Sequence, residues 1–432
     1  QADDVLPVNP YLKELAKFPA DYQERLKPIH ELYPNYIFIA DRTGTDFTDV
    51  LNIENTGFAK AVSIYSDGLS WRAMDEENYN WEKGIWYEDP TDWTKVSREV
   101  LAFYLDPRSS LDVNDIGRLY QFVEQSYDKT NQTKEILLRQ VRGTFLEGTY
   151  EYNEEDEVDK LYKGSYADVI MAAAEQSGVN PYVIVATIIQ EQGAYGTSPL
   201  ITGDYAGYEG YYNFFNYAAS GSDVVGNGLR YAKEKGWDSV ADSIIQGAIR
   251  YGEGYIRAGQ NTYYYKDFNV INQVYWHQYA SAVYDQVSSG YMLARAFQED
   301  RNASLIFRIP VYDNMPEEPC QRPVEDGRLN NYYLLDLQME GLEGTFSTYD
   351  FNYAANVFRD TTIAISLPET ASYIGEKTIS LDAGTQNINL PVMAESGYTR
   401  TYTVEVTAEV PCVLTVTEPI FTDVINDRDY WY

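Results

Sequence analysis

A glutamate at the end of one short segment offers the clearest chemistry in the chain. The segment 180–192 reads N-P-Y-V-I-V-A-T-I-I-Q-E-Q and is followed by Gly193. We predict a helix here, because asparagine is a good N-cap, proline suits the first helical position and glycine commonly follows the last turn. Four residues then share one helix face at the spacing i, i+3, i+4, i+7, namely Ile184, Thr187, Ile188 and Glu191.

The position of Glu191 on that face predicts a general acid. Burial raises the pKa of a carboxyl group, because the charged form loses its water. The negative end of the helix dipole acts in the same direction. A carboxyl group that stays protonated near neutral pH can donate its proton to a leaving group. The alternative is that Glu191 ends the helix as a solvated residue, as most glutamates do.

The composition excludes several classes of function. The chain has 432 residues, with 66 acidic and 33 basic side chains and a net charge of -33. This charge argues against nucleic acids and anionic membranes as partners, and no segment has the length of a membrane-spanning helix. The 41 tyrosines combine flat apolar faces with hydroxyl groups, which suits carbohydrate contacts. The chain starts Gln-Ala-Asp-Asp without methionine, so we expect a processed, secreted protein.

Histidine and cysteine are too few for many catalytic sites. A Ser-His-Asp or Cys-His system would have to use His30 or His277, and neither a histidine-rich zinc site nor a four-cysteine zinc site can be built. Carboxylate chemistry is the most natural choice that remains, and we expect no metal or organic cofactor. Cys320 and Cys412 form either one disulfide, which an exported protein would permit, or two free thiols.

Hydrophobic periodicity and capping residues predict a mainly helical chain up to about residue 300. The predicted helices span 9–26, 46–51, 97–104, 116–127, 133–145, 166–177, 180–192, 223–235, 239–252 and 273–297. The segment 36–40 is a predicted strand, and 71–93 is a predicted loop with aromatic anchors. The acid-rich segment 151–159 is a predicted solvated loop, with a calcium site as the alternative, although its spacing is not that of an EF-hand.

Short alternating segments follow and predict an all-β sandwich. The predicted strands are 305–311, 334–339, 361–367, 378–381, 387–392 and 400–406. In the last of these, Tyr402, Val404 and Val406 alternate with polar residues. Because the chain is too long for one compact core, we expect two or three domains. The acid-rich segment 151–159 and the change of period near residue 304 divide the chain at 1–160, 161–300 and 301–432.

Several motifs between residues 166 and 280 resemble one family in the same order. They are A-E-Q-S-G-V-N-P, I-I-Q-E-Q-G, Y-E-G-Y-Y-N-F-F-N, G-Q-N-T-Y-Y-Y-K-D-F-N-V and Y-W-H-Q-Y. This stretch resembles the catalytic domain of bacterial cell-wall endo-β-N-acetylglucosaminidases, glycoside hydrolase family 73. The segments Y-P-N-Y-I-F and Y-L-D-P-R resemble the region before that domain, and 331–408 resembles an appended cadherin-like sandwich.

The resemblance implies a multidomain fold. Residues 161–300 would form a mainly α-helical, lysozyme-like (α+β) core, on which an N-terminal α+β region packs. Residues 301–432 would form an immunoglobulin-like, all-β sandwich.

The resemblance also implies roles for single residues. The glutamate of the Q-E-x-G motif is the family's catalytic acid, and it corresponds to Glu191. The family's Asn-Leu-Phe-Gly motif corresponds to 213–216, so Asn213 and Phe214 are expected to contact an N-acetyl group and a sugar face, with core packing as the alternative for the phenylalanine. The family tyrosine before the last helix corresponds to Tyr279. The Ala-Thr-Asp that usually follows is Ala-Ser-Ala here, so the aspartate is absent.

A second catalytic group is harder to find in the sequence. Inverting hydrolysis needs a base that activates water. Asp223 looks like a helix N-cap, whereas Asp204 and Glu209 lie on a loop rich in glycine and tyrosine, and Glu209 is the preferred candidate. Without a base, the substrate's own N-acetyl oxygen would attack the anomeric carbon and lead to hydrolysis or to a 1,6-anhydro product.

The resemblance therefore implies a secreted, cell-wall-associated peptidoglycan hydrolase of the autolysin type. It would cleave the β-1,4 bond on the reducing side of N-acetylglucosamine, with peptidoglycan glycan strands as its partner, and we expect a monomer. Tyr279 and Tyr264 would stabilise charge or position the N-acetyl group, while Gln192, Tyr212 and Asn213 would hold the sugars. The alternatives are a lytic transglycosylase or muramidase on the same fold, a non-catalytic wall-binding protein, and an endoglycosidase acting on N-glycans or chitin.

Overall fold

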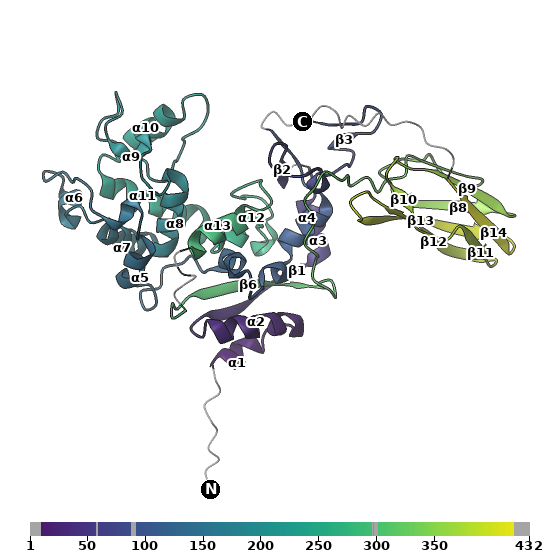
Figure 1. The fold of residues 1–432 in the computed structure, drawn as a ribbon, viewed down its shortest axis with the longest axis horizontal. Helices are drawn as coiled ribbons and strands as arrows, with labels where there is room; N and C mark the ends of the chain where they lie inside the picture. Colours follow the sequence, from purple (N-terminus) through teal and green to yellow (C-terminus); the bar gives the residue numbers. More distant parts are fainter. Residues whose placement is uncertain (1–9, 58, 88–91, 296, 298–300, 419–432) are drawn as a thin grey trace, which may run out of the picture. The chain divides into compact units, whose positions relative to one another are not determined.

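The chain forms two compact units, each assembled from separate stretches of sequence (Figure 1). The computed structural model describes residues 10–57, 59–87, 92–295, 297 and 301–418. The first unit takes residues up to Val50, Leu105–Ala280 and Tyr284–Pro319, and the second takes Leu51–Tyr104, Ser281–Val283 and the residues from Cys320 onward. The three consecutive domains expected from the sequence stay a prediction.

The first unit is mainly helical. Its α-helices are α1 Pro10–Leu15, α2 Ala20–Leu32, α5 Lys134–Gln140, α6 Glu157–Tyr162, α7 Tyr166–Ser177, α8 Pro181–Gln192, α9 Pro199–Thr202, α10 Val224–Lys235, α11 Val240–Tyr251, α12 Tyr263–Asp267 and α13 Asp285–Ala294. Shorter helices lie at Pro107–Ser110, Ile116–Phe122, Phe145–Glu147, Gly252–Ile256 and Ile271–Gln273. The helices α3 Phe47–Glu54 and α4 Arg98–Leu105 each have residues in both units, because the chain passes from one unit to the other after Val50 and after Tyr104.

Helix α8 lies at the centre of this unit and confirms the predicted bounds. The Asn180 side chain accepts a hydrogen bond from the Tyr182 N–H at 2.9 Å, as an N-cap does. Gly193 ends the helix with φ 74° and ψ 161°, a conformation that only glycine adopts readily. The helix is buried along most of its length and packs against α5, α7 and α13, so it is a core helix rather than one with a single apolar stripe.

Helix α7 has the predicted bounds, because its caps are the residues that the sequence offers. The Ser165 side chain accepts a hydrogen bond from the Asp168 N–H, and Gly178 ends the helix in the left-handed region. In the same way Asp223 caps α10 and Ser239 caps α11. The interpretation of Asp223 as an N-cap is therefore confirmed.

A parallel pair of strands, β1 Ile37–Asp46 and β6 Ile306–Asp313, joins the two ends of the first unit's sequence (Figure 1). Phe38 lies opposite Phe307, and both rings are buried. The prediction that 305–311 begins the C-terminal sandwich is wrong, because this strand pairs with β1. Alternation in sequence predicts a strand but does not specify its partner.

Four predicted helices differ from the structure. Of the segment 133–145, the α-helix takes only Lys134–Gln140. The segment 9–26 is interrupted before Pro19, because proline disfavours the helical conformation in the residue that precedes it. The segment gives α1 and the start of α2. The segment 116–127 is a buried 3₁₀ helix over Ile116–Phe122, which then turns extended. Among the described residues of 273–297 the α-helix covers Asp285–Ala294, and Gln273, Tyr275 and His277, which lie before it, have positive φ values. Residues 9 and 296 lie outside the described residues.

The second unit contains short irregular connections and two larger sheets. Its elements before the sheets are the 3₁₀ helix Leu69–Trp71 and the strand pairs β2 Ala61–Ser63 with β5 Trp93–Lys95, and β3 Tyr79–Asn80 with β4 Ile85–Trp86. The predicted loop 71–93 is irregular apart from these strands. Its aromatic anchors are confirmed, since the indole N–H groups of Trp81 and Trp86 donate to backbone carbonyls. Residues 88–91 lie outside the described part.

Two four-stranded sheets share one hydrophobic core. One has the order β10-β12-β13-β8 and the other β11-β14-β9-β7. The strands are β7 Asp336–Met339, β8 Asn352–Val357, β9 Thr361–Ser366, β10 Ser372–Tyr373, β11 Thr378–Leu381, β12 Gly384–Met393, β13 Thr399–Ala408 and β14 Cys412–Thr417. On β13 the residues Tyr402, Val404 and Val406 are fully buried, as their alternation predicts.

The two cysteines belong to the second unit and are not bridged. Cys412 is buried in the hydrophobic core of the sheets, and Cys320 is partly exposed. Of the two alternatives that the sequence left open, the structure has two thiols with no disulfide between them. Among the described residues, no helix is both long enough and apolar enough to span a membrane.

Candidate active site

Glu191 lies in the last turn of α8 and is partly buried. Burial raises the pKa of its carboxyl group, because the ionised form is poorly solvated there. Hydrogen bonds from Asn216 and Tyr279 and the positive charge of Lys266 oppose this effect, since each favours the ionised form. The net direction is upward, as a general acid requires.

Two side chains contact the Glu191 carboxyl group from separate segments of the chain. The Asn216 amide donates to Oε2 at 2.8 Å, and the same Nδ2 atom donates to the backbone carbonyl of Glu191 at 3.0 Å. The Tyr279 hydroxyl donates to Oε1 at 3.3 Å. The carboxyl group is thus held at both oxygens, which fixes the direction in which it can offer a proton.

Gln192 holds the Asn216 segment against the end of α8. Its Nε2 atom donates to the backbone carbonyls of Asn213 and Phe214 at 3.0 and 3.1 Å, and to the Asn216 side-chain oxygen at 2.6 Å. Asn216 has φ 52°, in the left-handed region that asparagine tolerates better than most residues. Gln192 is buried in this arrangement, and the hydrogen bonds of its side chain go to this segment of the protein.

The predicted substrate contacts Asn213, Phe214 and Tyr264 are fully buried. The Asn213 amide donates to the carbonyls of Tyr217 and Gly228 at 2.8 and 2.9 Å and so shapes the loop. The Tyr264 hydroxyl donates to the Leu105 carbonyl at 2.6 Å. Side chains in these positions present no surface to a sugar, and for Phe214 the structure has the core-packing alternative.

Tyr212 and Glu209 lie on the loop between α9 and α10. Tyr212 is partly buried and packs closely over Gly203. Glu209 is exposed, and both of its carboxylate oxygens accept from the Gly207 N–H at 3.1 Å. Backbone hydrogen bonds lower the pKa of Glu209, so this side chain is a carboxylate at neutral pH. The hydroxyl group of Thr202 donates to the Asp204 carboxylate on the same loop.

Asn216 is the contact that the sequence reasoning missed. In the motif N-F-F-N, the first two residues, Asn213 and Phe214, were expected to contact the substrate. The structure shows that the last residue, Asn216, donates to Glu191. An asparagine after two buried aromatic residues, shortly before a run of small residues, is a signal for a left-handed turn. Such a turn can bring a short amide side chain back toward the preceding helix.

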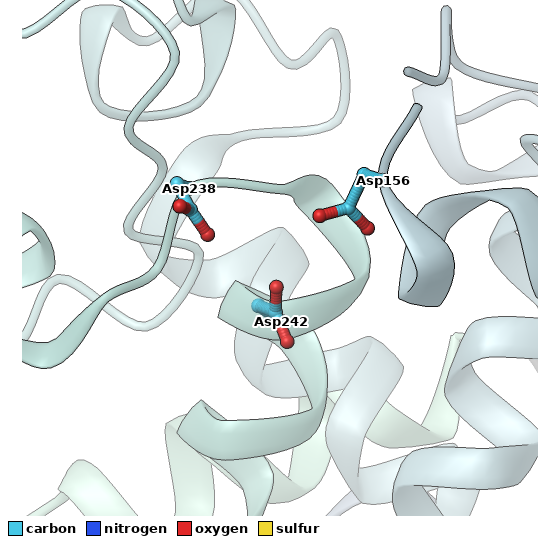
Figure 2. A group of neighbouring side chains, drawn as sticks. All are labelled: Asp156, Asp238 and Asp242. Carbon is cyan, nitrogen blue, oxygen red and sulfur yellow. The ribbon is translucent and has the colours of Figure 1, made fainter. Parts of the chain in front are cut away.

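An acidic cluster elsewhere in the first unit is the one group of described residues with metal-ligand spacing. Asp156, Asp238 and Asp242 place carboxylate oxygens within 4.8 Å of one another (Figure 2). Asp156 caps α6 and comes from the acid-rich segment 151–159, and Asp242 accepts from the Ser239 hydroxyl at 2.8 Å. Burial and the neighbouring carboxylates raise the pKa of Asp242. Exposed acidic groups are common without an ion, and the cluster has no contact with Glu191 among those described.

Comparison with known proteins gives relatives in sequence. No protein-family profile matches the chain. The bifunctional autolysin of Staphylococcus epidermidis is 30% identical over 169 residues, which cover 36% of this chain and 12% of that protein. The bifunctional autolysin of Staphylococcus aureus is 33% identical over 141 residues, which cover 30% of this chain and 11% of that protein. The chain thus matches only about an eighth of the length of these relatives.

Two crystal structures show a weaker likeness. The structure of a major bifunctional autolysin has a TM-score of 0.44 and 22% identity, over 64% of this chain and 99% of that one. That of S. aureus glucosaminidase B has a TM-score of 0.46 and 20% identity, over 65% and 96%. Over about a third of its length the chain is related to the bifunctional autolysins, and the predicted resemblance to cell-wall glucosaminidases is confirmed.

Proposed function

We propose that this protein is an exported peptidoglycan hydrolase that cleaves the β-1,4 bond on the reducing side of N-acetylglucosamine. One observation carries the proposal: Glu191 is a partly buried carboxyl group of raised pKa, held between the Asn216 amide and the Tyr279 hydroxyl. The sequence similarity to bifunctional autolysins supports it. The two lines are independent, since one rests on geometry and the other on ancestry.

In the proposed reaction Glu191 is the general acid. Its proton passes to the glycosidic oxygen while the bond from that oxygen to the anomeric carbon breaks through an oxocarbenium-like transition state. The leaving sugar keeps the proton as a hydroxyl group, and water supplies the new oxygen on the anomeric carbon. The Glu191 carboxylate that remains is stabilised by the two donors that already contact it, Asn216 and Tyr279.

The activation of water is assigned to Glu209 as part of the same proposal. Its carboxylate is exposed and ionised, as a base must be. To take the proton from a water molecule that attacks the anomeric carbon, Glu209 would have to leave the Gly207 N–H, which a surface loop rich in glycine permits. The substrate's own N-acetyl oxygen is the other nucleophile consistent with a single buried carboxyl group.

The finer assignments of fold and location belong to the proposal as well. The helices around α8 would form a lysozyme-like core, and the two four-stranded sheets with their common core would form an immunoglobulin-like, cadherin-type module. The protein would act as a monomer on the glycan strands of the cell wall. Gln192, Asn213 and Phe214 would shape the groove from beneath, and Tyr279 would contact the substrate, because 40% of its surface is exposed.

Digestion of purified peptidoglycan tests the proposal. The wild type, Glu191→Gln, Glu209→Gln and the control Glu175→Gln, which changes an exposed glutamate on α7, are incubated with it, and the reduced products are analysed by mass spectrometry. We expect new reducing N-acetylglucosamine ends from the wild type and the control. Glu191→Gln should lose at least about a hundredfold in rate, the usual contribution of a general acid.

Each other outcome changes a different part of the proposal. Anhydro-muramyl ends would identify a lytic transglycosylase and remove the need for Glu209. Equal rates in the wild type and Glu191→Gln would overturn the role of Glu191. A wild type that binds the wall but releases nothing would be a wall-binding protein.

A further inference from the structure

A buried lysine contacts the ring of Tyr279, whose hydroxyl donates to the proposed acid. Lys266 is on α12, and only 3% of its surface is exposed. Its ammonium nitrogen donates to the Tyr251 hydroxyl at 2.9 Å, and that hydroxyl donates in turn to Gln125 at 2.7 Å. A buried charge costs free energy, and a methionine of similar length would fill the space without that cost. The charge therefore calls for a reason beyond packing.

Four tyrosine rings surround this ammonium group. The distances from the nitrogen to the ring centroids are 3.9 Å for Tyr279, 4.6 Å for Tyr251, 5.2 Å for Tyr255 and 5.3 Å for Tyr263. All lie within the range of a cation–π interaction, and the ring of Tyr279 is the nearest. Tyr279 is also the ring whose hydroxyl contacts Glu191 at 3.3 Å.

The backbone around Lys266 fixes the same tyrosine. The Tyr279 N–H donates to the Lys266 carbonyl at 2.8 Å, and the Ala280 N–H donates to the Asp267 carboxylate at 3.1 Å. Helix α12 thus holds this segment by its backbone, and Lys266 holds the ring. Both contacts act within the first unit.

Burial and several charged groups act in opposite directions on the pKa of Lys266. Burial lowers the pKa of Lys266, while Asp267, Asp285, Glu191 and the Tyr255 hydroxyl oppose that effect. Asp285 also acts on Glu191, where its negative charge raises the pKa of the carboxyl group, and Lys266 acts in the opposite direction.

We propose that Lys266 is a positioning residue for the general acid: its ammonium group holds the Tyr279 ring so that the hydroxyl meets Glu191, and its charge stabilises the carboxylate left after proton transfer. The inference rests on the proposed function of Glu191. In this arrangement Lys266 acts on Glu191 through Tyr279 and does not contact the substrate. Lys266 is therefore not a catalytic residue itself.

Titration of Glu191 without substrate tests the inference separately from the function. Protein labelled with ¹³C at the glutamate carboxyl groups is titrated by NMR, and Glu191→Gln identifies the resonance. We expect Lys266→Met to raise the pKa of Glu191 and Lys266→Arg to leave it close to that of the wild type. Lys235→Met is the matched control, because it removes an exposed lysine that lies 5.6 Å from the ring of Tyr231 on the same unit.

Kinetics on peptidoglycan give the second measurement. In Lys266→Met we expect kcat to fall about tenfold to a hundredfold, since the tyrosine is no longer held in place, and the basic limb of the pH profile to move to higher pH. In a Tyr279→Phe background the same change should cost clearly less, because the two residues act through one hydroxyl. Lys266→Gln, which keeps an N–H donor for Tyr251, replaces Lys266→Met if the latter does not fold.

Two results would overturn the inference. The first is an unchanged Glu191 titration in the folded neutral variants, and the second is a loss of kcat that adds fully to that of Tyr279→Phe. If no variant, the wild type included, cleaves peptidoglycan, then the proposed function fails, while the NMR titration still decides the role of Lys266.

Discussion

At the scale of single residues, the pKa of the Glu191 carboxyl group is set by effects that oppose one another. Burial favours the neutral carboxyl group, whereas two hydrogen bonds and one positive charge favour the carboxylate. The first effect is the larger, so the proton is retained at a higher pH than in water. The others keep the acid strong enough to release that proton.

Removal of the Asn216 side chain tests this balance. In Asn216→Gly the carboxyl group loses the 2.8 Å hydrogen bond that stabilises its ionised form. The pKa of Glu191 should therefore rise, and kcat should fall about tenfold to a hundredfold. The measurement is the pH profile of kcat. Glycine is the right replacement, because it accepts the left-handed backbone of this position without strain.

Asn314→Gly is the matched control for that variant. Asn314 has φ 50°, lies in the same unit and donates to Asp46 at 2.8 Å, with no contact to Glu191 among those described. It should leave the profile unchanged. A control that loses as much activity as Asn216→Gly would mean that the effect comes from the backbone.

Glu191 should also lower the free energy of unfolding at neutral pH. A carboxyl group whose pKa is raised by folding binds its proton more tightly in the native state, so stability falls as pH rises from the unfolded toward the folded pKa. Glu191→Gln cannot ionise and should be more stable than the wild type at pH 7. Near pH 3 the difference should vanish. Thermal unfolding at both pH values measures it, and an equal gain at both would refute the explanation.

At the scale of elements, caps decided how much of the fold the sequence predicted. The helices α7, α8, α10 and α11 are capped by Ser165, Asn180, Asp223 and Ser239, and the predicted starts at 166, 180, 223 and 239 lie within one residue of these caps. A cap is a local interaction, so a single sequence contains it. The strand β6 was predicted with the wrong partner, because strand pairing depends on residues far away in the chain.

The site shows the same limit. Glu191 was found, since its position depends on one helix. The segment 273–284 was predicted to be helical, although three of its residues adopt positive φ values there. That segment is held by the Asn269 and Gln260 contacts from other parts of the chain and brings Tyr279 to the acid. Tertiary contacts overrode the local preference for a helix, and hydrophobic periodicity cannot predict such contacts.

The cap of α8 should contribute measurably to stability. Asn180 is buried, and besides its bond from Tyr182 it donates to the Glu124 carbonyl at 3.0 Å. Asn180→Ala should lower the free energy of unfolding by about 1–3 kcal/mol, because it removes a cap and leaves a buried carbonyl without this donor. Asn180→Ser restores the cap alone and should recover part of the loss. Chemical denaturation of both variants checks this, and equal values for them would assign the whole effect to Glu124.

At the scale of the whole molecule, the net charge of -33 sets the response to salt. An acidic chain repels itself and also repels the anionic polymers of a cell wall. Salt screens both effects, since the Debye length falls from about 10 Å at 0.1 M to about 3 Å at 1 M.

If the wall is bound through contacts with sugars, then NaCl should raise the melting temperature and leave binding to whole walls undiminished. Sedimentation with purified walls between 20 mM and 1 M NaCl, together with thermal unfolding in the same buffers, measures both quantities. Sodium chloride is preferable to sulfate, which would also strengthen the burial of apolar surface. Binding that is lost at high salt would show that basic side chains hold the wall, against the balance of 33 basic and 66 acidic residues.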